Sequence, residues 1–238
     1  MTTALIFAGG TGQRMNTRAK PKQFLELHGK PIIIYTLEHF EFHPEVDNII
    51  IVCLEGWILE LKHLIQQHAI GKVSQIVPGG DGGDRSIYNG LKAMDGKYAP
   101  DDIVLIHDGV RPLINADLIS ANIAKARERG ISITIEAATE SVVRLNGGDL
   151  IAEIPPRAEM YTAKAPQSFR YDLIWGLYQR SHNDGIRTID SAHLCSIYGV
   201  DMHTVKSTPN NMKITAPTDF YIFRALYEAM ENEQILGF

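Results

Sequence analysis

The sequence alternates short apolar runs with segments of helical periodicity, and this alternation restricts the possible fold more than any other feature. Five apolar runs have the length of strands: Ala4–Phe7, Asn48–Cys53, Val73–Val77, Ile103–His107 and Ile131–Glu136. Helical patterns lie between them: Pro31–Phe40, Gly56–Gln67, Ser86–Met94 and Ala116–Glu128. Repeated strand–helix units form a mainly parallel sheet with helices on both faces. We therefore predict an α/β, Rossmann-like fold.

The strand–helix pattern is interrupted after residue 136. Two short apolar segments, Ser141–Leu145 and Leu150–Ile154, flank Asn146-Gly147-Gly148-Asp149. Asn-Gly between such segments is the strongest short-range signal for a β-hairpin. We predict a β-arm over residues 139–160, inserted into a single domain that spans residues 1–238. Such an arm is suited to contact a partner, although a surface hairpin without a partner fits the sequence equally well.

Three helices are predicted after the arm, and no repeat or low-complexity tract is present. Their expected ranges are Tyr171–Arg180, Ser191–Ile197 and Pro217–Met230.

Composition excludes several classes of protein. A formal net charge of −5 and a pI near 6.0 argue against a nucleic acid or an anionic membrane as partner. The N-terminus has no basic region of the kind that begins a signal peptide, and no apolar run reaches membrane-spanning length. Two distant cysteines, Cys53 and Cys195, provide no disulfide framework. We expect a cytoplasmic protein.

A glycine-rich turn follows the first predicted strand. It runs Ala8-Gly9-Gly10-Thr11-Gly12-Gln13-Arg14-Met15, and Pro21-Lys22-Gln23-Phe24 comes shortly after it. Glycines lack a β-carbon, so backbone N–H groups can approach an anion closely. Arg14 and Lys22 can bring positive charge to the same place. The combination predicts a site for a nucleoside triphosphate, although an ordinary βα turn with a surface arginine is the simpler alternative.

Two other glycine-rich motifs do not fit this turn. A dinucleotide fingerprint requires a third glycine where Met15 stands, and an acidic residue about 20 positions later; Glu26 comes too early. A P-loop requires Gly-Lys-Ser/Thr, which is missing from the sequence.

Three later segments add polar groups that could reach the same crevice, because ligands of such sheets bind outside the carboxyl ends of the strands. The Gly79–Ser86 loop has four glycines in five residues and could pass close to a base or ribose. Asp108 and Arg111 could hold a metal ion and a phosphate side by side, and Lys213 precedes a predicted helix. The alternatives are a connecting loop, a salt-bridged pair and a solvated lysine. We interpret His107 as a packed loop residue rather than a metal ligand.

Taken in order, these motifs resemble one family. A-G-G-T-G-x-R-M, P-K-Q-F, G-G-D, H-D-x-x-R-P, R-x-x-x-Y-x-x-x-x-P-Q-x-F and N-x-K-I-T are similar to the cytidylyltransferases that make CDP-activated polyols. These enzymes act on 2-C-methyl-D-erythritol 4-phosphate or ribitol 5-phosphate. The resemblance runs from Ala8 to about Thr215. It implies a fold of the nucleotide-diphospho-sugar transferase type, in which a β-arm embraces a second subunit, and hence a homodimer.

The resemblance also implies roles for individual residues. The catalytic cations would be Arg14, Lys22 and Lys213. The nucleotide CTP would be bound by Ala8, Gly9, Gly10, Thr11, Gly12, Gly79, Gly80, Asp81, Ser86 and Asp108. Asp108 would also hold Mg²⁺. The polyol phosphate would be bound by Arg111, Ser141 and Arg157, with Arg157 reaching over from the partner's arm.

The sequence departs from the family pattern at three positions, and the two lost hydroxyls are on the acceptor side. Gly83 stands where the loop usually has arginine, Ala165 replaces a threonine before Pro-Gln, and Ile189 replaces a threonine before Asp190. The use of CTP is therefore a safer expectation than any named polyol. The segment Ile154–Tyr161 looks more like the ribitol-5-phosphate branch, and we expect that substrate or a related pentitol or pentulose phosphate.

Other functions remain open at this point. The first alternative is 2-C-methyl-D-erythritol 4-phosphate cytidylyltransferase of isoprenoid biosynthesis. A non-catalytic nucleotide-binding protein and an NAD-dependent oxidoreductase are alternatives of a different class. The three cations Arg14, Lys22 and Lys213 and the acid Asp108 argue against a mere binder, and the missing dinucleotide fingerprint argues against the oxidoreductase.

Overall fold

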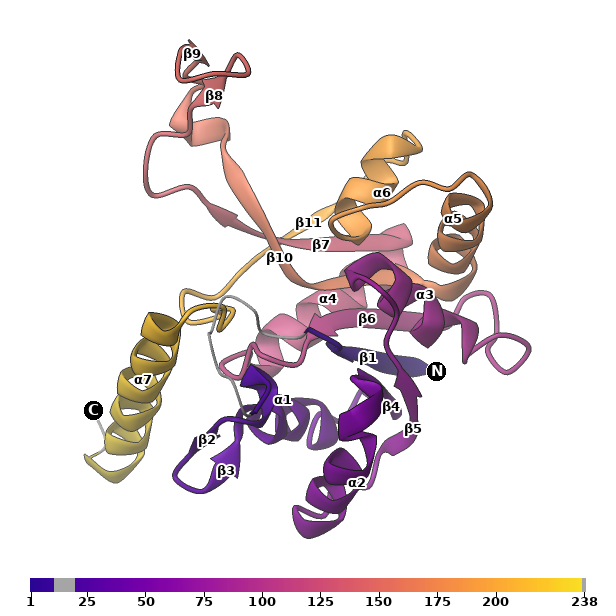
Figure 1. Ribbon diagram of the computed structural model, residues 1–238, viewed down its shortest axis with the longest axis vertical. Coiled ribbons are helices and arrows are strands. Elements are labelled where there is room, and N and C mark those ends of the chain that lie inside the picture. The colour runs from indigo at the N-terminus through magenta and orange to yellow at the C-terminus, as the bar shows by residue number, and fades with distance from the viewer. Residues whose placement is uncertain (11–19, 237–238) are drawn as a thin grey trace.

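A seven-stranded mixed sheet organises the computed structural model, which describes residues 1–10 and 20–236 (Figure 1). The strand order is β11-β7-β10-β6-β1-β4-β5, and all neighbours are parallel except that β10 runs antiparallel to both β6 and β7. The strands are β1 Thr2–Ala8, β4 Asn48–Cys53, β5 Val73–Pro78, β6 Ile103–Asp108, β7 Ile131–Ala137, β10 Tyr161–Arg170 and β11 Thr204–Lys206. The predicted α/β fold with a mainly parallel sheet is confirmed.

All five predicted strands are present, with ends within two residues of the prediction. The antiparallel strand β10 was not predicted. Its middle, Lys164-Ala165-Pro166-Gln167, interrupts the apolar pattern, and a proline is unusual inside a sheet. The pairing with β7 shifts register between Lys164 and Gln167, so Ala165 and Pro166 form a bulge next to the crevice.

Helices cover both faces of the sheet, as predicted. The α-helices are α1 Ile32–Glu41, α2 Ile58–Gln67, α3 Gly83–Lys92, α4 Ala116–Arg129, α5 Tyr171–Asn183, α6 Ser191–Ile197 and α7 Pro217–Leu236. Short 3₁₀ turns lie at η2 Lys22–Phe24, η3 Glu55–Trp57 and η4 Arg157–Glu159. The predicted loop Gly79–Ser86 is therefore shorter than expected, because its second half forms the first turn of α3.

Successive side chains of β1 point alternately into two apolar cores, one on each face of the sheet. Ala4 and Ile6 face a core that α1, α2 and α4 complete, whereas Leu5 faces a core formed with α3, α5 and α6. Successive side chains of a strand point to opposite faces, so a strand buried on both sides is apolar throughout. This is why the central strands could be recognised in the sequence as continuous apolar runs.

A third apolar cluster attaches α7 to the rest of the molecule. The Phe223 ring of α7 meets the Tyr35 ring of α1 edge to face, with the ring centroids 5.5 Å apart. A two-stranded ribbon, β2 Glu26–Leu27 and β3 Lys30–Pro31, contributes Leu27 to the same cluster. At the start of α7, the Asp219 carboxylate accepts hydrogen bonds from the backbone N–H groups of Thr215 and Ala216. These contacts fix the segment that precedes α7.

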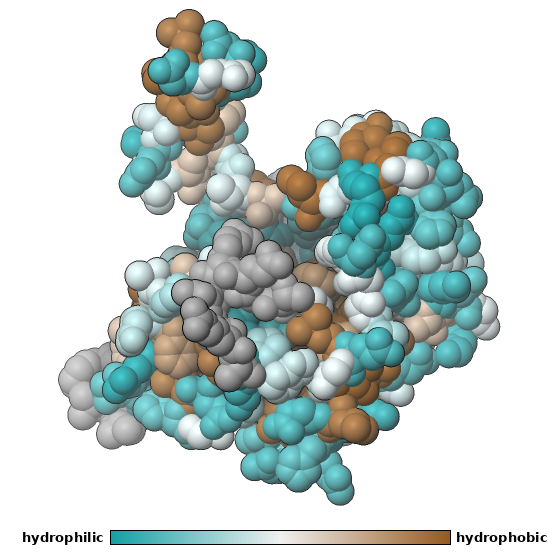
Figure 2. Space-filling model, in the orientation of Figure 1, coloured by the Kyte–Doolittle hydropathy of each residue, from teal (hydrophilic) through white to brown (hydrophobic). Residues whose placement is uncertain are grey.

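The predicted β-arm projects from the sheet (Figure 1). Its paired strands, β8 Arg144–Leu145 and β9 Ile151–Glu153, are shorter than predicted. Apolar side chains gather at its tip (Figure 2), and the large exposed ones on the arm are Val142, Val143, Leu145, Leu150, Ile151 and Ile154. Among the helices of residues 1–10 and 20–236, none combines the length and apolar character needed to cross a bilayer.

Candidate active site

Two cavities meet at the carboxyl ends of β1 and β6, where Phe7 pairs with Asp108 in the parallel register. The first cavity has a volume of about 190 Å³, and the second about 150 Å³. Both are lined by Phe7, Asp108 and Lys213. The first cavity also contains Arg111, Lys164, Ala165, Gln167, Ile189 and Asp190; the second contains Ala8, Gly10, Lys22 and Gln23. The position of the crevice agrees with the sequence prediction.

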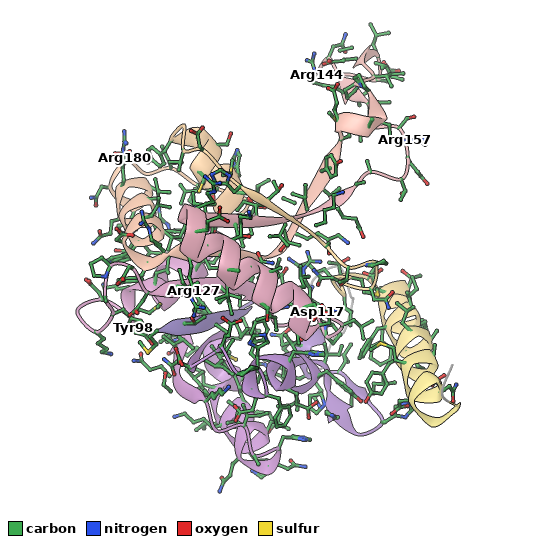
Figure 3. All side chains as sticks on the ribbon, turned by 180° about the vertical axis from the view of Figure 1, so that it is seen from behind. Tyr98, Asp117, Arg127, Arg144, Arg157 and Arg180 are labelled. Carbon is green, nitrogen blue, oxygen red and sulfur yellow. The ribbon has the colours of Figure 1, made fainter. Side chains whose placement is uncertain are left out.

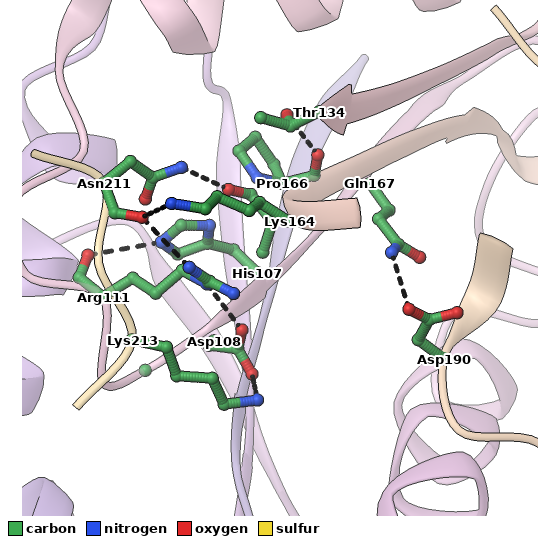
Figure 4. A network of polar contacts seen from close by, with 12 residues as sticks. His107, Asp108, Arg111, Thr134, Lys164, Pro166, Gln167, Asp190, Asn211 and Lys213 are labelled. Carbon is green, nitrogen blue, oxygen red and sulfur yellow. Dashed lines mark hydrogen bonds and ion pairs between the residues drawn. The ribbon is translucent and has the colours of Figure 1, made fainter. Parts of the chain in front are cut away.

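Asp108, at the last position of β6, holds one cation on each carboxylate oxygen (Figure 4). Lys213 Nζ lies 2.6 Å from Oδ1, and Arg111 Nε lies 2.8 Å from Oδ2. Burial alone would raise the pKa of this carboxyl, but Lys213 and then Arg111 outweigh it and hold the pKa well below its usual range. Asp108 is therefore a permanent anion that fixes two cations where the cavities meet.

Arg111 and His107, which are close to Asp108 in the sequence, are both buried. Arg111 Nη1 donates to the backbone oxygen of Asn211 at 3.1 Å. His107 lies in strand β6, within the predicted strand Ile103–His107, and is packed as predicted: its ring lies on Phe40 with the centroids 5.1 Å apart. Burial lowers the pKa of His107 to about 3, so its ring is neutral and adds no charge to the site.

Lys22 and Gln23 connect three segments that are distant in sequence. Gln23 is buried and donates from Nε2 to the backbone oxygens of Ala8 at 2.7 Å and Gly10 at 3.4 Å. Lys22 Nζ donates to the backbone oxygen of Ile214 at 2.9 Å. In the P-K-Q-F motif, Gln23 thus supports the start of the glycine-rich turn, and Lys22 contacts the segment that contains Lys213. Gln23 was not among the predicted site residues.

The second glycine-rich loop lies against the first. Ser86 Oγ accepts from the N–H of Gly80 at 2.9 Å and donates to the oxygen of Gly82 at 2.8 Å. A β-carbon added at Gly9 or at Gly79 would lie 3.2 Å from Ser86 Oγ, and Gly9 Cα is itself close to Gly79. Such contacts are tighter than most real ones, so both positions favour glycine. The structure thereby brings together Gly9, Gly79, Gly80 and Ser86, as predicted.

Asp81 has a different environment from the one expected. Its side chain is 74% exposed and pairs with Arg187, whose Nη1 lies 3.3 Å from Oδ2. Arg187 also binds the Asp84 carboxylate with two nitrogens, at 2.7 and 3.0 Å. This arginine connects the α5–α6 loop to the first turn of α3. Nothing in the sequence distinguished it from a solvated surface arginine.

Some predicted residues lie elsewhere. Ser141 and Arg157 are exposed on the β-arm, and in the described part of the chain they line neither cavity (Figure 3). Arg157 Nη1 donates to the arm's own backbone, at Thr139 O, 3.5 Å away. The role predicted for Arg157 involves a second subunit, and within one subunit the described residues do not bring Ser141 to either cavity. Thr11, Gly12 and Arg14 lie outside the described residues.

Asp108 is the acidic side chain at the junction of the cavities that could bind a divalent cation. Among the described residues, no group of three His, Cys, Asp and Glu side chains gathers to form a metal cage. Mg²⁺ usually keeps several waters and binds one or two carboxylates together with substrate phosphates. An ionised Asp108 at the junction of two cavities fits that mode, in which the nucleotide supplies the other ligands.

Comparison with known proteins agrees with the resemblance noted in the sequence. Residues 2–229 match the family described as 2-C-methyl-D-erythritol 4-phosphate cytidylyltransferase, IspD. The chain is 44% identical to the ribitol-5-phosphate cytidylyltransferase of Streptococcus agalactiae serotype Ia over 238 residues, which is the full length of both. It is 32% identical to a 2-C-methyl-D-erythritol 4-phosphate cytidylyltransferase of Clostridium botulinum, covering 96% of this chain and 98% of the relative.

The fold agrees as well. The crystal structure of 4-diphosphocytidyl-2C-methyl-D-erythritol synthase from Anaerococcus prevotii superposes with a TM-score of 0.84 and 26% sequence identity, covering 96% of each chain. The full-length sequence match and the shared fold lead to one conclusion: the chain belongs to the IspD family of polyol-phosphate cytidylyltransferases.

Proposed function

We propose that this protein joins CTP to D-ribitol 5-phosphate and releases CDP-ribitol and pyrophosphate. The observation that supports it best is that the two cavities share Asp108 and Lys213. One cavity is bounded by the glycine-rich turn, which suits a triphosphate, and the other extends toward Arg111 and Lys164. Two phosphorylated substrates placed in them would meet at the shared Lys213, which Asp108 holds.

The reaction needs charge compensation more than acid–base chemistry. An oxygen of the acceptor phosphate attacks the α-phosphorus of CTP, and the bond from that phosphorus to the oxygen bridging to the β-phosphate breaks. The attacking oxygen is already anionic, and pyrophosphate leaves as an anion. No side chain has to remove a proton, which fits a site of fixed Arg, Lys and Asp groups without a Ser-His or Cys-His pair.

Each residue then has a role that its contacts support. Lys213 and Lys22 reduce the repulsion between the two phosphates and stabilise the charge on the α-phosphate. Arg111 binds the acceptor phosphate, Gln23 holds the glycine-rich turn, and Asp108 orients the cations and would hold Mg²⁺. A bound Mg²⁺ would neutralise part of the triphosphate charge and stabilise the leaving pyrophosphate. Arg14 is proposed as a further cation on the basis of the sequence motif.

The choice of ribitol 5-phosphate over methylerythritol phosphate has two supports. Relatives named ribitol-5-phosphate cytidylyltransferase are 44% and 43% identical to this chain over its full length, against 32% for the methylerythritol enzyme of C. botulinum. The acceptor cavity also has Ala165 and Ile189 where the family pattern has threonines. We further propose a homodimer built by the β-arm, with Arg157 completing the partner's acceptor site.

A pyrophosphate-release screen tests this proposal. It pairs CTP, UTP, ATP and GTP with the phosphates of ribitol, ribulose, xylulose, methylerythritol and glycerol. We expect release with CTP and ribitol 5-phosphate at the highest kcat/KM. Preference for methylerythritol phosphate would favour the alternative acceptor, and release only with another nucleotide would contradict the use of CTP. CTP binding without release for any acceptor would indicate a non-catalytic binder.

A further inference from the structure

Lys164 lies in the wall of the first cavity, although no motif singled it out. It belongs to β10 and directly precedes the bulge at Ala165 and Pro166. Bulges next to a site can aim a side chain where a regular strand would not. The Lys164 side chain is only 15% exposed and lines the same cavity as Arg111 and Lys213. A nearly buried ammonium group in a substrate cavity needs a chemical explanation.

Two contacts fix the Lys164 ammonium group. Nζ forms a close ion pair with Glu136 of β7. It also donates to the backbone oxygen of Asn211 at 3.4 Å (Figure 4). Arg111 Nη1 donates to that same oxygen at 3.1 Å. The shared carbonyl makes Lys164 and Arg111 direct neighbours. An ammonium group has three N–H donors, so these two contacts leave one available for a ligand in the cavity.

Charges around the cavity favour an anion. Its lining contains three cations, Arg111, Lys164 and Lys213, and two carboxylates, Asp108 and Asp190. Asp108 is engaged by two of the cations. Asp190 accepts hydrogen bonds from Gln167 Nε2 at 3.2 Å and from the His193 N–H at 2.8 Å, which directs it toward β10 and α6. Among the described residues, Glu136 is the carboxylate that pairs with the Lys164 ammonium group, and it does not line the cavity.

Resting on the function proposed above, we propose that Lys164 binds the phosphate group of the acceptor and works with Arg111. Without a substrate the ammonium group is paired with Glu136, and when the acceptor binds, its phosphate accepts the remaining N–H donor. Lys164 thereby compensates for the hydroxyl that Ala165 lacks in comparison with the family pattern. A charged donor also binds a phosphate more strongly than a hydroxyl does.

A purely structural ion pair is the alternative. In the β7–β10 register, Glu136 faces Thr162 and Lys164 faces Thr134, so the two charged residues are diagonal neighbours. Such a pair could simply connect the two strands. The two explanations differ in what each variant changes: a structural pair affects stability through either partner, whereas phosphate binding depends on Lys164 alone.

The test measures steady-state pyrophosphate release with CTP and ribitol 5-phosphate for the wild type, K164Q, K164R and E136Q. For K164Q we expect the KM for ribitol 5-phosphate to rise about 10- to 100-fold, as on loss of a charge-assisted hydrogen bond to phosphate. The KM for CTP should stay within about twofold. K164R should recover most of the loss, and E136Q should change the acceptor KM by less than about threefold.

One further variant and one probe keep the result decisive. The double variant E136Q/K164Q leaves no unpaired carboxylate and should show the same raised KM as K164Q. Inorganic phosphate should compete with the acceptor in the wild type, and its inhibition constant should rise in K164Q. An unchanged acceptor KM in K164Q or the double variant would overturn the proposal, as would equal effects of K164Q and E136Q on KM.

Failure of the proposed function would be recognised separately. If the wild type releases no pyrophosphate with any polyol phosphate, calorimetric titration with inorganic phosphate still tests Lys164. Weaker phosphate binding by K164Q than by the wild type would support the role of Lys164, and equal binding would overturn it.

Discussion

At the residue scale, the site depends on charges whose ionisation is fixed by their neighbours. Asp108 stays ionised because Lys213 and Arg111 outweigh the cost of burying it, and His107 stays neutral because it is buried. In these two adjacent residues of β6 the pKa is set by different causes: neighbouring cations keep Asp108 charged, and burial keeps His107 neutral. Neither changes its charge near neutral pH, so the arrangement of cations around the substrates is constant.

His107 gives a pH prediction with a definite sign. Its folded pKa, about 3, is below the unfolded value of about 6.5, so the unfolded chain binds a proton first as the pH falls. Its contribution to stability is complete above about pH 6.5 and decreases toward pH 3. We expect the free energy of unfolding of the wild type to fall more steeply than that of H107F, by up to about 1.4 kcal/mol per pH unit.

Urea unfolding of both proteins at pH 7, 6 and 5 measures this difference. Parallel pH dependences would show that His107 is not buried in its neutral form. The H107F variant keeps an aromatic ring against Phe40, so loss of packing is controlled.

At the element scale, long-range polar contacts connect segments that the sequence shows only separately. Arg187 connects the α5–α6 loop to α3, and Gln23 connects η2 to the end of β1. A buried network around Asn122 connects α4 to β7: Asn122 Nδ2 donates to Thr134 Oγ1 at 3.0 Å, and Ser132 Oγ donates to Asn122 Oδ1 at 2.9 Å. Thr134 in turn donates to the oxygen of Pro166 in the bulge.

Loss of the Asn122 amide should weaken this connection. In N122A the Ser132 hydroxyl loses its buried acceptor, and Thr134 loses a donor although it still donates to Pro166; an unsatisfied buried group costs about 1–3 kcal/mol. We expect N122A to lower the free energy of unfolding by about 3 kcal/mol, measured by denaturant titration. K125A, on the same helix, removes only an exposed ion pair with Glu128; it is the control and should change stability by less than about 1 kcal/mol. Equal losses in the two variants would contradict the network's importance.

Arg187 should affect nucleotide binding more than stability. It holds Asp81 and Asp84 at the start of α3, next to the loop that ends at Gly82. We expect R187Q to raise the KM for CTP by about three- to tenfold because the loop loses its positioning, while kcat stays nearly constant. Steady-state kinetics with varied CTP measures both. An unchanged KM for CTP in R187Q would show that the contacts of Arg187 with Asp81 and Asp84 do not affect nucleotide binding.

At the scale of the whole molecule, the sequence predicted what local chemistry determines and missed what distant contacts determine. Asn48–Cys53 was predicted with its observed ends because a run of apolar residues buried on both faces is visible locally. Strand β10 was missed because its pairing depends on β6 and β7, which are far away in the chain. Likewise Asp108, Lys213 and Lys22 were chosen as site residues because they lie in motifs. Lys164 and Arg187 were not chosen, because their partners Glu136 and Asp84 are distant in the sequence.

The β-arm gives a prediction about assembly. Its exposed apolar side chains suggest a subunit interface, because single exposed apolar residues are common but a contiguous group indicates a partner. We expect I151D to convert a dimer to a monomer in size-exclusion chromatography with light scattering, and to lose activity because Arg157 no longer reaches the other site. A mixture of R157A and K213A proteins should regain activity through hybrid dimers. Full activity of a monomeric variant would contradict this assembly.

The central claim is that the cations at the junction of the two cavities let two phosphates come close enough to form a bond. The most direct test follows CTP and ribitol 5-phosphate by phosphorus NMR, with wild type and K213A. For the wild type we predict that the α-phosphorus signal of CTP is converted to that of a CDP-polyol in equal amount with pyrophosphate. For K213A the rate should fall by about 10²- to 10³-fold with the melting temperature retained. A K213A protein that forms the product at the wild-type rate would contradict the account.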